Sequence, residues 1–431
     1  MSGSGLSALA GFAALFALIA LRVPVGIAMG LVGVGGFAAV AGLTPALNLL
    51  KTSPVRTITD YNLSLIPMFV LMGALATRSG MSHELFRAGH AWLGRFRGGL
   101  ALATLGACGG FAAICGSSVA TAASMTRIAL PEMRRFGYRD DIATGVIAAG
   151  GTVGILIPPS VVLAVYAFIT EQDVGRLFVA GIVPGLLAVV FYMATVRLAY
   201  GRALPPGTPV GRAERWRSLG GVWAVGLLFL AIIGGIYAGV VTPTEAAAAG
   251  AFLTGLIGVM RRRLDGPALM ESLTEALRTT VAIFTILIGA LLFGYFLAVT
   301  QSPQKVTAFL VDLGLGSYAT LLLVLLLFLV LGCVLDAMAM IILLVPIVFP
   351  VVEALGFDPV WFGVVVVMTV ELGLITPPVG MNVFVLSSTV GRAAPSDVVF
   401  RGVLWFFVID IALLGLLIAA PSIITFLPSL G

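Results

Sequence analysis

The chain contains 431 residues, of which 60% are hydrophobic and only 10% are charged, and its formal net charge is +5. Soluble domains carry about a quarter charged residues, so this composition excludes a soluble globular protein and predicts an all-α polytopic membrane protein. Because the basic residues flank apolar segments instead of forming a solvated face, we expect no nucleic acid among the partners.

The predicted membrane segments follow one another along the whole chain. Apolar stretches that reach or approach the roughly 20 residues needed for a bilayer crossing lie at 6–21, 24–43, 62–77, 142–170, 177–196, 220–240, 244–260, 281–299, 360–390 and 402–427. Two further apolar stretches, 98–133 and 317–352, have small polar residues near their centres. We interpret these two as re-entrant helical hairpins. No charged region with a cleavage site precedes the first segment, so the N-terminus is expected to be mature.

Proline pairs interrupt two of these segments, 142–170 and 360–390. The motif Gly-Ile-Leu-Ile-Pro-Pro-Ser begins at Gly154, and the similar motif Gly-Leu-Ile-Thr-Pro-Pro-Val begins at Gly373. Proline removes a backbone donor and disrupts the helical ladder. Both segments are therefore predicted to be broken transmembrane helices.

The spacing between the two motifs, from Gly154 to Gly373, recurs between Pro131 and Pro350, which indicates two copies of one unit. We assign residues 1–217 to the first repeat and residues 218–431 to the second, each with scaffold helices, one hairpin and one broken helix. Each copy has an odd number of crossings, so the repeat is predicted to be inverted. With a periplasmic N-terminus, 19 of the 24 basic residues lie in cytoplasmic connections, which agrees with the positive-inside rule.

Inverted repeats with broken helices are typical of secondary transporters, which hold their substrate and ions near the membrane midplane. Four segments are expected to meet there: the hairpin centres at Ser117 and Asp336, and the breaks that follow Thr152 and Glu371. Ser117 and Asp336 have the repeat spacing, as do Thr152 and Glu371. The second copy therefore has carboxylates where the first has hydroxyls. Unwound backbone supplies carbonyl oxygens for sodium, and half-helix N-termini suit a carboxylate.

Several of these residues also have a purely structural interpretation. Glycine near the breaks would allow close helix packing, and serine hydroxyls would bond to backbone within a helix. A carboxylate at membrane depth is costly unless it is paired, hydrated or protonated. Glu371 is then either simply protonated or, if protons drive transport, the coupling group. Arg127 either contacts a substrate carboxylate or extends to the inner surface.

At these residues the chain resembles the large membrane (M) subunit of tripartite ATP-independent periplasmic (TRAP) transporters. The resemblance lies in stretches that begin at Gly116, Ile128, Ala148, Leu177 and Gly373, and it covers essentially the whole chain. It implies an elevator-type carrier of the bacterial inner membrane, in which two hairpins and two broken helices move against a scaffold. It further implies an organic-acid substrate delivered by a periplasmic solute-binding protein, and a separate small four-helix membrane subunit.

The resemblance also implies Na+ as the coupling ion, bound between each hairpin tip and its broken helix, with no cofactor. The first predicted sodium site is formed by Ser117, Ser118, Gly151, Thr152, Gly154 and Pro158. The second is formed by Gly332, Asp336, Gly373, Thr376, Pro377 and Val379. The substrate is expected to contact Ser117, Ser118, Arg127, Pro158, Ser160 and Asn382.

Three other functions share some of these features. A stand-alone sodium- or proton-coupled anion carrier of the same superfamily would share the hairpins but need no binding protein. An intramembrane enzyme with Ser117 as its nucleophile would need a base, but the two histidines, His83 and His90, fall in the basic inner connection. A scaffolding protein would have no reason to interrupt its helices symmetrically. We therefore predict a transporter and not an enzyme.

Overall fold

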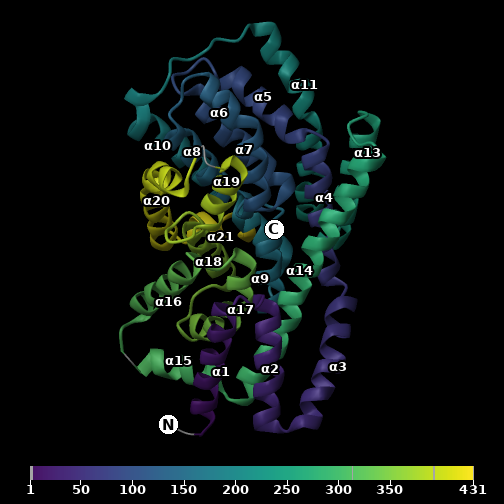
Figure 1. Cartoon of the computed structure of the whole chain (residues 1–431), viewed down its shortest axis with the longest axis vertical. Helices are drawn as coiled ribbons and strands as arrows, with labels where there is room; N and C mark the ends of the chain where they lie inside the picture. The colour runs from purple at the N-terminus through teal and green to yellow at the C-terminus, as the bar shows by residue number, and fades with distance from the viewer. Residues whose placement is uncertain (1–2, 313, 392–393, 431) are drawn as a thin grey trace.

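The computed structural model describes residues 3–312, 314–391 and 394–430, and these residues form helices and no strand. The prediction of an all-α protein is therefore confirmed. Helices α1 (Gly3–Ala20), α2 (Val25–Ala41) and α3 (Leu43–Thr59) form the end of the molecule that carries the N-terminus (Figure 1). The next helix, α4 (Leu65–Arg78), continues towards the opposite end.

Two similar series of helices follow. The first consists of α5 (Met81–Leu93), α6 (Gly99–Cys115), α7 (Ser118–Arg135), α8 (Asp140–Thr152), α9 (Val161–Thr170) and α10 (Val174–Tyr200). The chain then continues through α11 (Arg212–Phe229), α12 (Gly235–Tyr237), α13 (Pro243–Met260) and α14 (Gly266–Val299). The second series consists of α15 (Ser302–Asp312), α16 (Ser317–Gly332), α17 (Ala337–Ala354), α18 (Pro359–Leu374), α19 (Met381–Val390) and α20 (Ser396–Ala419), with a short α21 (Ser422–Thr425) at the end.

The two series have the same order of lengths and breaks. Helix α7 begins at Ser118 and α17 at Ala337, while α8 begins at Asp140 and α18 at Pro359. Both pairs of helix starts have the spacing that the proline motifs predict. The division at residue 217 and the inverted orientation of the second copy remain predictions.

Six helices among the described residues are long and apolar enough to cross a membrane, judged by length and composition. They are Val174–Ala203, Arg212–Tyr237, Pro243–Met260, Gly266–Val299, Ala337–Ala354 and Ser396–Ala419. Shorter apolar helices include α9, α18 and α19, which flank the two breaks. The chain is therefore a multi-pass membrane protein, as its composition predicts.

Helices α3 and α14 differ from the predicted segments. We expected separate spans at 62–77 and 281–299, but α3 and the helical segment Asn62–Arg78 form a pair bent by 62°, and α14 is one helix of 34 residues. The bend lies at Asp60, whose carboxylate accepts a hydrogen bond from Asn62 N at 2.8 Å. Lys51 and Arg56 lower the hydropathy of α3, which is why the sequence did not reveal it.

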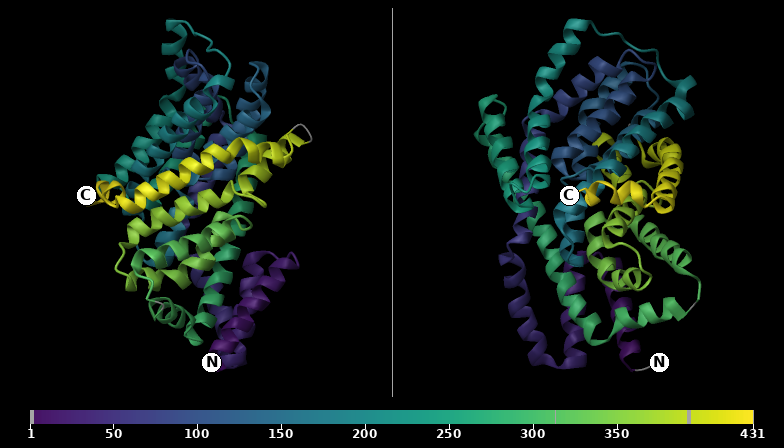
Figure 2. Two further views of the ribbon diagram at one scale, coloured as in Figure 1. Left: turned by 90° about the vertical axis from the view of Figure 1, so that its left-hand side faces the viewer. Right: turned by 180° about the vertical axis from the view of Figure 1, so that it is seen from behind.

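The helices pack into two groups. In one group α14 packs against α2 and α4, and α4 packs against α13. In the other, α8 packs against α7 and α20, α9 against α17, and α16 against α18. Helix α20 crosses the middle of the molecule (Figure 2). The groups meet where α4 and α14 contact α6, α9 and α17.

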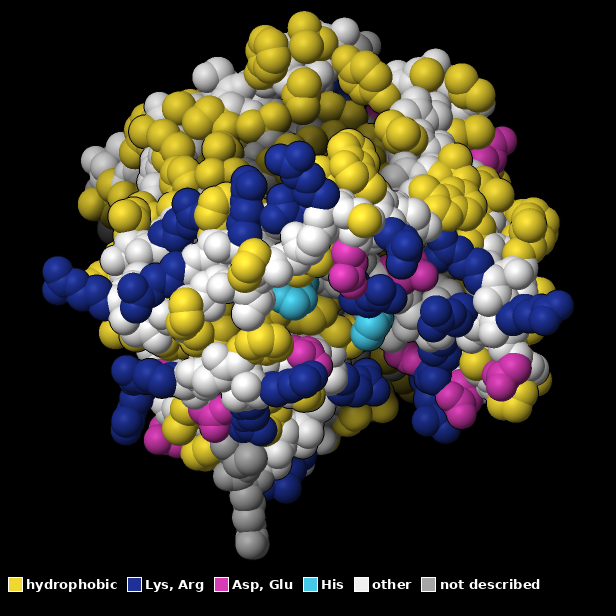
Figure 3. Space-filling view, turned by 90° about the horizontal axis from the view of Figure 1, so that it is seen from above, with side chains coloured by type: hydrophobic (Ala, Val, Ile, Leu, Met, Phe, Trp, Pro, Cys, Tyr) yellow, Lys and Arg dark blue, Asp and Glu magenta, His cyan; other side chains and the backbone are white. Residues whose placement is uncertain are grey.

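One end of the molecule is rich in arginine, as Figure 3 shows. Several connections meet there: Arg97 donates hydrogen bonds to the carbonyls of Leu204 and Arg202, and Arg261 pairs with Glu84 at 2.6 Å. Arg97 thus joins the α5–α6 and α10–α11 connections, and Arg261 joins the α13–α14 connection to α5. The N-terminus lies at the opposite end (Figure 1).

Candidate functional site

The first hairpin turns at Gly116 and Ser117, between α6 and α7. Gly116 has φ of +61°, a left-handed conformation that suits glycine. Ser117 caps α7, because its hydroxyl accepts a hydrogen bond from Ala120 N at 3.3 Å. Its carbonyl accepts the hydroxyl of Thr121 at 2.8 Å. The tip is thus a tight turn with oxygen atoms and a helix N-terminus at its apex.

The first helix break separates α8 from α9. After Thr152 the chain forms a 3-10 turn and then the cis Pro158-Pro159 bond. Ser160 is fully buried and caps α9, since it accepts from Leu163 N at 3.2 Å and donates to the carbonyl of Ile155. The helix is therefore broken at the predicted position.

The first tip and the first break are packed backbone against backbone. A Cβ atom on Gly154 would lie 2.7 Å from the carbonyl oxygen of Ser117, and one on Gly151 would lie 2.8 Å from Cβ of Ala122. Glycine at both positions is what permits this approach. The structure thus brings Ser117, Gly151, Thr152 and Gly154 of the first predicted sodium site into one region.

The second hairpin repeats this arrangement with a carboxylate. Asp336 caps α17 by accepting hydrogen bonds from Met338 N at 2.9 Å and Ala339 N at 3.1 Å. This cap is the counterpart of the serine cap on the first hairpin, and it accepts two amide donors instead of one. Asp336 occupies the position that corresponds to Ser117 in the repeat.

The second break joins the second hairpin through backbone hydrogen bonds. Helix α18 ends at Leu374, the Pro377-Pro378 bond is cis, and α19 begins at Met381. The amides of Val379 and Gly380 both donate to the carbonyl of Cys333 at 3.3 Å. The remaining residues of the second predicted sodium site, Gly332, Gly373 and Thr376, belong to the same tip and break.

Both tips open into one cavity of about 340 Å³. Its lining includes Ser117, Ser118 and Asp336 from the tips, and Ile155 and Leu374 from the broken helices. Ile155 and Leu374 are again related by the repeat spacing. The two copies therefore contribute equivalent positions to a single space.

The opposite wall of this cavity comes from the other group of helices. Helix α4 contributes Val70, Gly73, Ala74 and Thr77, and α14 contributes Glu275, Thr279, Ala282, Ile283 and Ile286. A second cavity, of about 1060 Å³, lies between the same two helices and α9 and α17. Hollows thus occur at two places along the contact between the two helix groups.

The predicted substrate residues are not all at the cavity. Ser117 and Ser118 line it, whereas Pro158, Ser160 and Asn382 are buried and outside its lining. The Asn382 amide donates to the carbonyl of Ala148 at 3.4 Å, which ties α19 to α8. Arg127 is exposed on α7, and its Nε bonds to the carbonyl of Ala123 in the same helix.

A buried polar chain, which the sequence did not reveal, extends from the first break. The hydroxyl of Thr152 lies 3.0 Å from that of Tyr192, which donates to the carboxylate of Asp410 at 2.9 Å. Glu371 is fully buried nearby and has no hydrogen-bond partner among the described residues. Tyr192 and Asp410 lie on α10 and α20, outside the duplicated motifs, so only the packing of these helices reveals their pairing.

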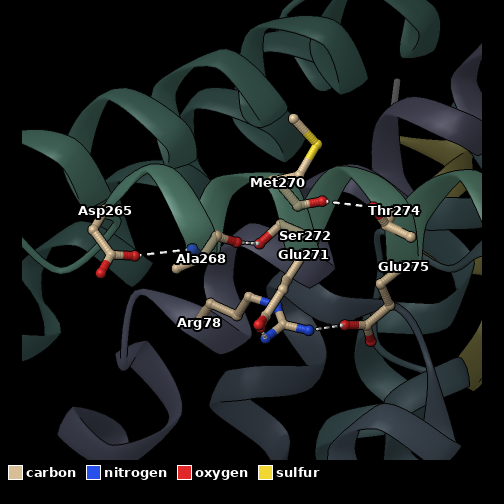
Figure 4. Close-up of polar contacts among 8 residues, drawn as sticks. All are labelled: Arg78, Asp265, Ala268, Met270, Glu271, Ser272, Thr274 and Glu275. Carbon is tan, nitrogen blue, oxygen red and sulfur yellow. Dashed lines mark hydrogen bonds and ion pairs between the residues drawn. The ribbon is translucent and has the colours of Figure 1, made fainter.

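The sequence also did not identify the charged residues at the cavity wall. Arg78, the last residue of α4, is paired with Glu271 and Glu275 of α14 (Figure 4). Glu271 and Glu275 are one helical turn apart, so both carboxylates face the guanidinium. The sequence places their segment in an inner connection, because the apolar run begins only near residue 281.

Comparisons with known proteins agree with this architecture. Residues 12–423 match the family described as "Tripartite ATP-independent periplasmic transporter, DctM component". The chain is 37% identical over 401 residues to the C4-dicarboxylate TRAP transporter large permease protein DctM of Pseudomonas aeruginosa, covering 90% of this chain and 93% of that protein. It is 33% identical to the sialic acid TRAP transporter large permease protein SiaM of Vibrio cholerae, covering 89% and 90%.

A solved structure extends the comparison to the fold alone. The YdaH transporter of Alcanivorax borkumensis superposes with a TM-score of 0.59 at 17% sequence identity. The alignment covers 88% of this chain and 90% of that one. The helix arrangement is thus shared with a transporter whose sequence is only distantly similar.

Proposed function

The chain belongs to the DctM component family of tripartite ATP-independent periplasmic transporters, and we propose that its function is sodium-coupled uptake of an organic acid. Large permeases of this family are transporters and not enzymes. In this proposal the chain lies in the bacterial inner membrane, receives its substrate from a periplasmic solute-binding protein and acts with a small four-helix membrane subunit. The arginine-rich end faces the cytoplasm and the N-terminus faces the periplasm, in keeping with the positive-inside rule.

The observation that carries the proposal is the cavity shared by both hairpin tips. A solute in this space meets Ser117 and Ser118 on one tip and Asp336 on the other, together with the N-terminal ends of α7 and α17. Helix N-termini offer unpaired amide groups and a partial positive charge, which suit a carboxylate. Relatives named for C4-dicarboxylates and for sialic acid make an organic acid the proposed substrate class.

The residues around each tip fit a small cation. A glycine lies at each contact between tip and break, at Gly154 and at Gly373. A Cβ atom at either position would clash with the backbone of the tip. Carbonyl and hydroxyl oxygens surround both contacts, and the second also has the Asp336 carboxylate. Among the described residues no group of three or more His, Cys, Asp or Glu side chains gathers, so these sites suit sodium better than a transition metal. Sodium bound there would join the hairpin to the broken helix and prepare the substrate site.

The proposed movement is that of an elevator. The hairpins and broken helices pack together as one group, while α2, α4, α13 and α14 form the other. Sliding of the first group along α4 and α14 would carry the cavity from one side of the membrane to the other. Two cavities lie along the region where α9 and α17 face α4 and α14. Their positions support this motion.

The decisive experiment is transport by the complete complex in proteoliposomes, with the binding protein added outside. Uptake of radiolabelled succinate is expected to stop when sodium is replaced by potassium at constant pH and membrane potential. Uptake that persists without sodium and follows a proton gradient would contradict sodium coupling. Binding of candidate acids to the partner binding protein, measured by calorimetry, would identify the substrate.

A further inference from the structure

Among the described residues, the charged side chains that line the shared cavity are acidic, so positive charge there comes from the helix N-termini. The charged lining residues are Asp336 and Glu275, and none of the described residues that line the cavity is Lys, Arg or His. A carboxylate leaving the tips therefore meets the Glu275 carboxylate on the α14 side of the cavity. Like charges at short range repel strongly where water is scarce. The guanidinium of Arg78, just outside the cavity, is already bound by Glu275 and neutralises its charge.

Arg78 lies immediately outside the cavity, held by two carboxylates. Its Nη2 is 2.9 Å from Glu275, its Nη1 pairs with Glu271, and its Nε is buried without a hydrogen-bond partner among the described residues. Figure 4 shows both glutamates reaching this guanidinium from α14. Arginine has five N–H donors in a planar fork that matches carboxylate geometry. Arg78 therefore has a donor, Nε, that neither glutamate engages.

Glu275 connects the cavity with the outside. Together with Thr279 it lines both the cavity and an open groove of about 770 Å³, which also includes Arg78, Glu271, Thr274 and Arg278. The Glu275 side chain is 51% exposed and that of Arg78 is 30% exposed. Ion pairs with this exposure are weak and exchange readily. A carboxylate arriving from the cavity can thus compete for Arg78.

We propose that this groove is an exit site for the carboxylate solute, in which the solute displaces Glu275 from Arg78 and Arg278 adds a second positive charge. This inference rests on the proposed function, since it takes the solute to be an organic acid. Glu275 acts as an internal substitute for the solute: it neutralises Arg78 when the groove is empty. It also limits how tightly Arg78 holds the leaving anion, which favours release.

Glu275→Gln and Glu271→Gln form a matched pair for the test. Each removes one carboxylate from Arg78, but only Glu275 lines the cavity. Proteoliposomes containing the full complex are preloaded with succinate, and initial uptake of radiolabelled succinate is measured with the binding protein outside only. The measured quantity is the internal succinate concentration that halves the initial rate.

Glu275→Gln is expected to lower this concentration roughly tenfold, because Arg78 then retains the solute from the inside. Glu271→Gln is expected to change it less than twofold. Arg78→Gln should raise it roughly tenfold, and Arg78→Lys should restore it in part, since lysine keeps the charge but not the fork. Thermal unfolding of each purified complex shows whether a variant is folded.

The outcomes separate this inference from the proposed function. If the wild-type complex shows no sodium-dependent succinate uptake, the proposed function fails for this acid and the exit site fails with it. If the wild type transports succinate but Glu275→Gln and Glu271→Gln show the same internal inhibition, only the exit site is overturned. The same conclusion follows if Arg78→Lys and Glu275→Gln both behave like the wild type.

Discussion

Gly332 and Gly373 lie in direct backbone contact, so the second hairpin and the second broken helix touch without any intervening side chain. A Cβ atom on Gly373 would lie 2.7 Å from Cα of Gly332. Real Cβ atoms do not approach backbone so closely, and backbone cannot move aside as a flexible side chain can. The contact fixes how the tip is placed beside the proposed second sodium site.

Gly373→Ala is expected to separate this tip from its broken helix. Overpacking of this kind costs about 1–3 kcal/mol, and we expect a lower melting temperature together with loss of sodium-dependent uptake. Gly415→Ala on α20 is the control, because a Cβ there meets no atom within 4 Å. Wild-type stability and uptake in Gly373→Ala would show that the contact is dispensable.

The Asp336 carboxylate caps α17, and its proposed second role, as a sodium ligand, can be tested separately. Asp336→Ala removes the acceptor for Met338 N and Ala339 N, and loss of an N-cap costs about 0.5–2 kcal/mol. Asp336→Asn keeps an oxygen for the cap but removes the charge. We expect both variants to need more sodium for half-maximal uptake, and only the alanine variant to melt at a clearly lower temperature. An unchanged sodium requirement in Asp336→Asn would exclude the carboxylate as a ligand.

Tyr192 and Asp410 are expected to be energetically coupled. Tyr192→Phe leaves the buried Asp410 carboxylate without its donor, which costs about 1–3 kcal/mol. The double variant Tyr192→Phe/Asp410→Leu should be more stable than the sum of the single effects predicts, by about 0.5–3 kcal/mol. Thermal unfolding of the four proteins measures this coupling. Tyr200→Phe, whose hydroxyl bonds to the carbonyl of Gly402 instead, should combine additively with Asp410→Leu.

The packing of α2 on α14 depends on small residues. A Cβ atom on Gly289 would overlap the carbonyl of Gly26, whereas one on Gly294, further along the same helix, meets no atom within 4 Å. Close approach through glycine is a common way for membrane helices to associate. Gly289→Ala should lower stability by about 1–3 kcal/mol and Gly294→Ala should not. Equal melting temperatures for both variants would contradict this packing.

The sequence predicted the breaks and tips because proline and glycine act locally. The pairs Pro158-Pro159 and Pro377-Pro378 each interrupt a helix whatever packs against it, and the repeat spacing between them supports both predicted breaks. Ser117 and Asp336 followed as equivalent positions of the two tips, and the structure then showed that both cap a helix. All of these features are encoded by residues that are close together in the chain.

The remaining features depend on which helices become neighbours. Tyr192 and Asp410 are 218 residues apart, and their contact exists only because α10 packs against α20. Glu275 lies before the apolar run of α14, so its place on the cavity wall follows from the length of that helix. Arg127, in turn, was expected either to contact a substrate carboxylate or to extend to the inner surface, and the structure shows it exposed on α7 with its Nε bonded to the carbonyl of Ala123.

The length of α14 has a consequence for where solutes meet water. Its 34 residues extend about 51 Å at 1.5 Å per residue, whereas the hydrocarbon layer is about 30 Å thick. Even when tilted, α14 extends from the hydrocarbon layer into the headgroup region. Glu271 and Glu275 lie within its first three turns. In the proposed exit route, a departing solute would therefore pass from the membrane interior to water along this one continuous helix.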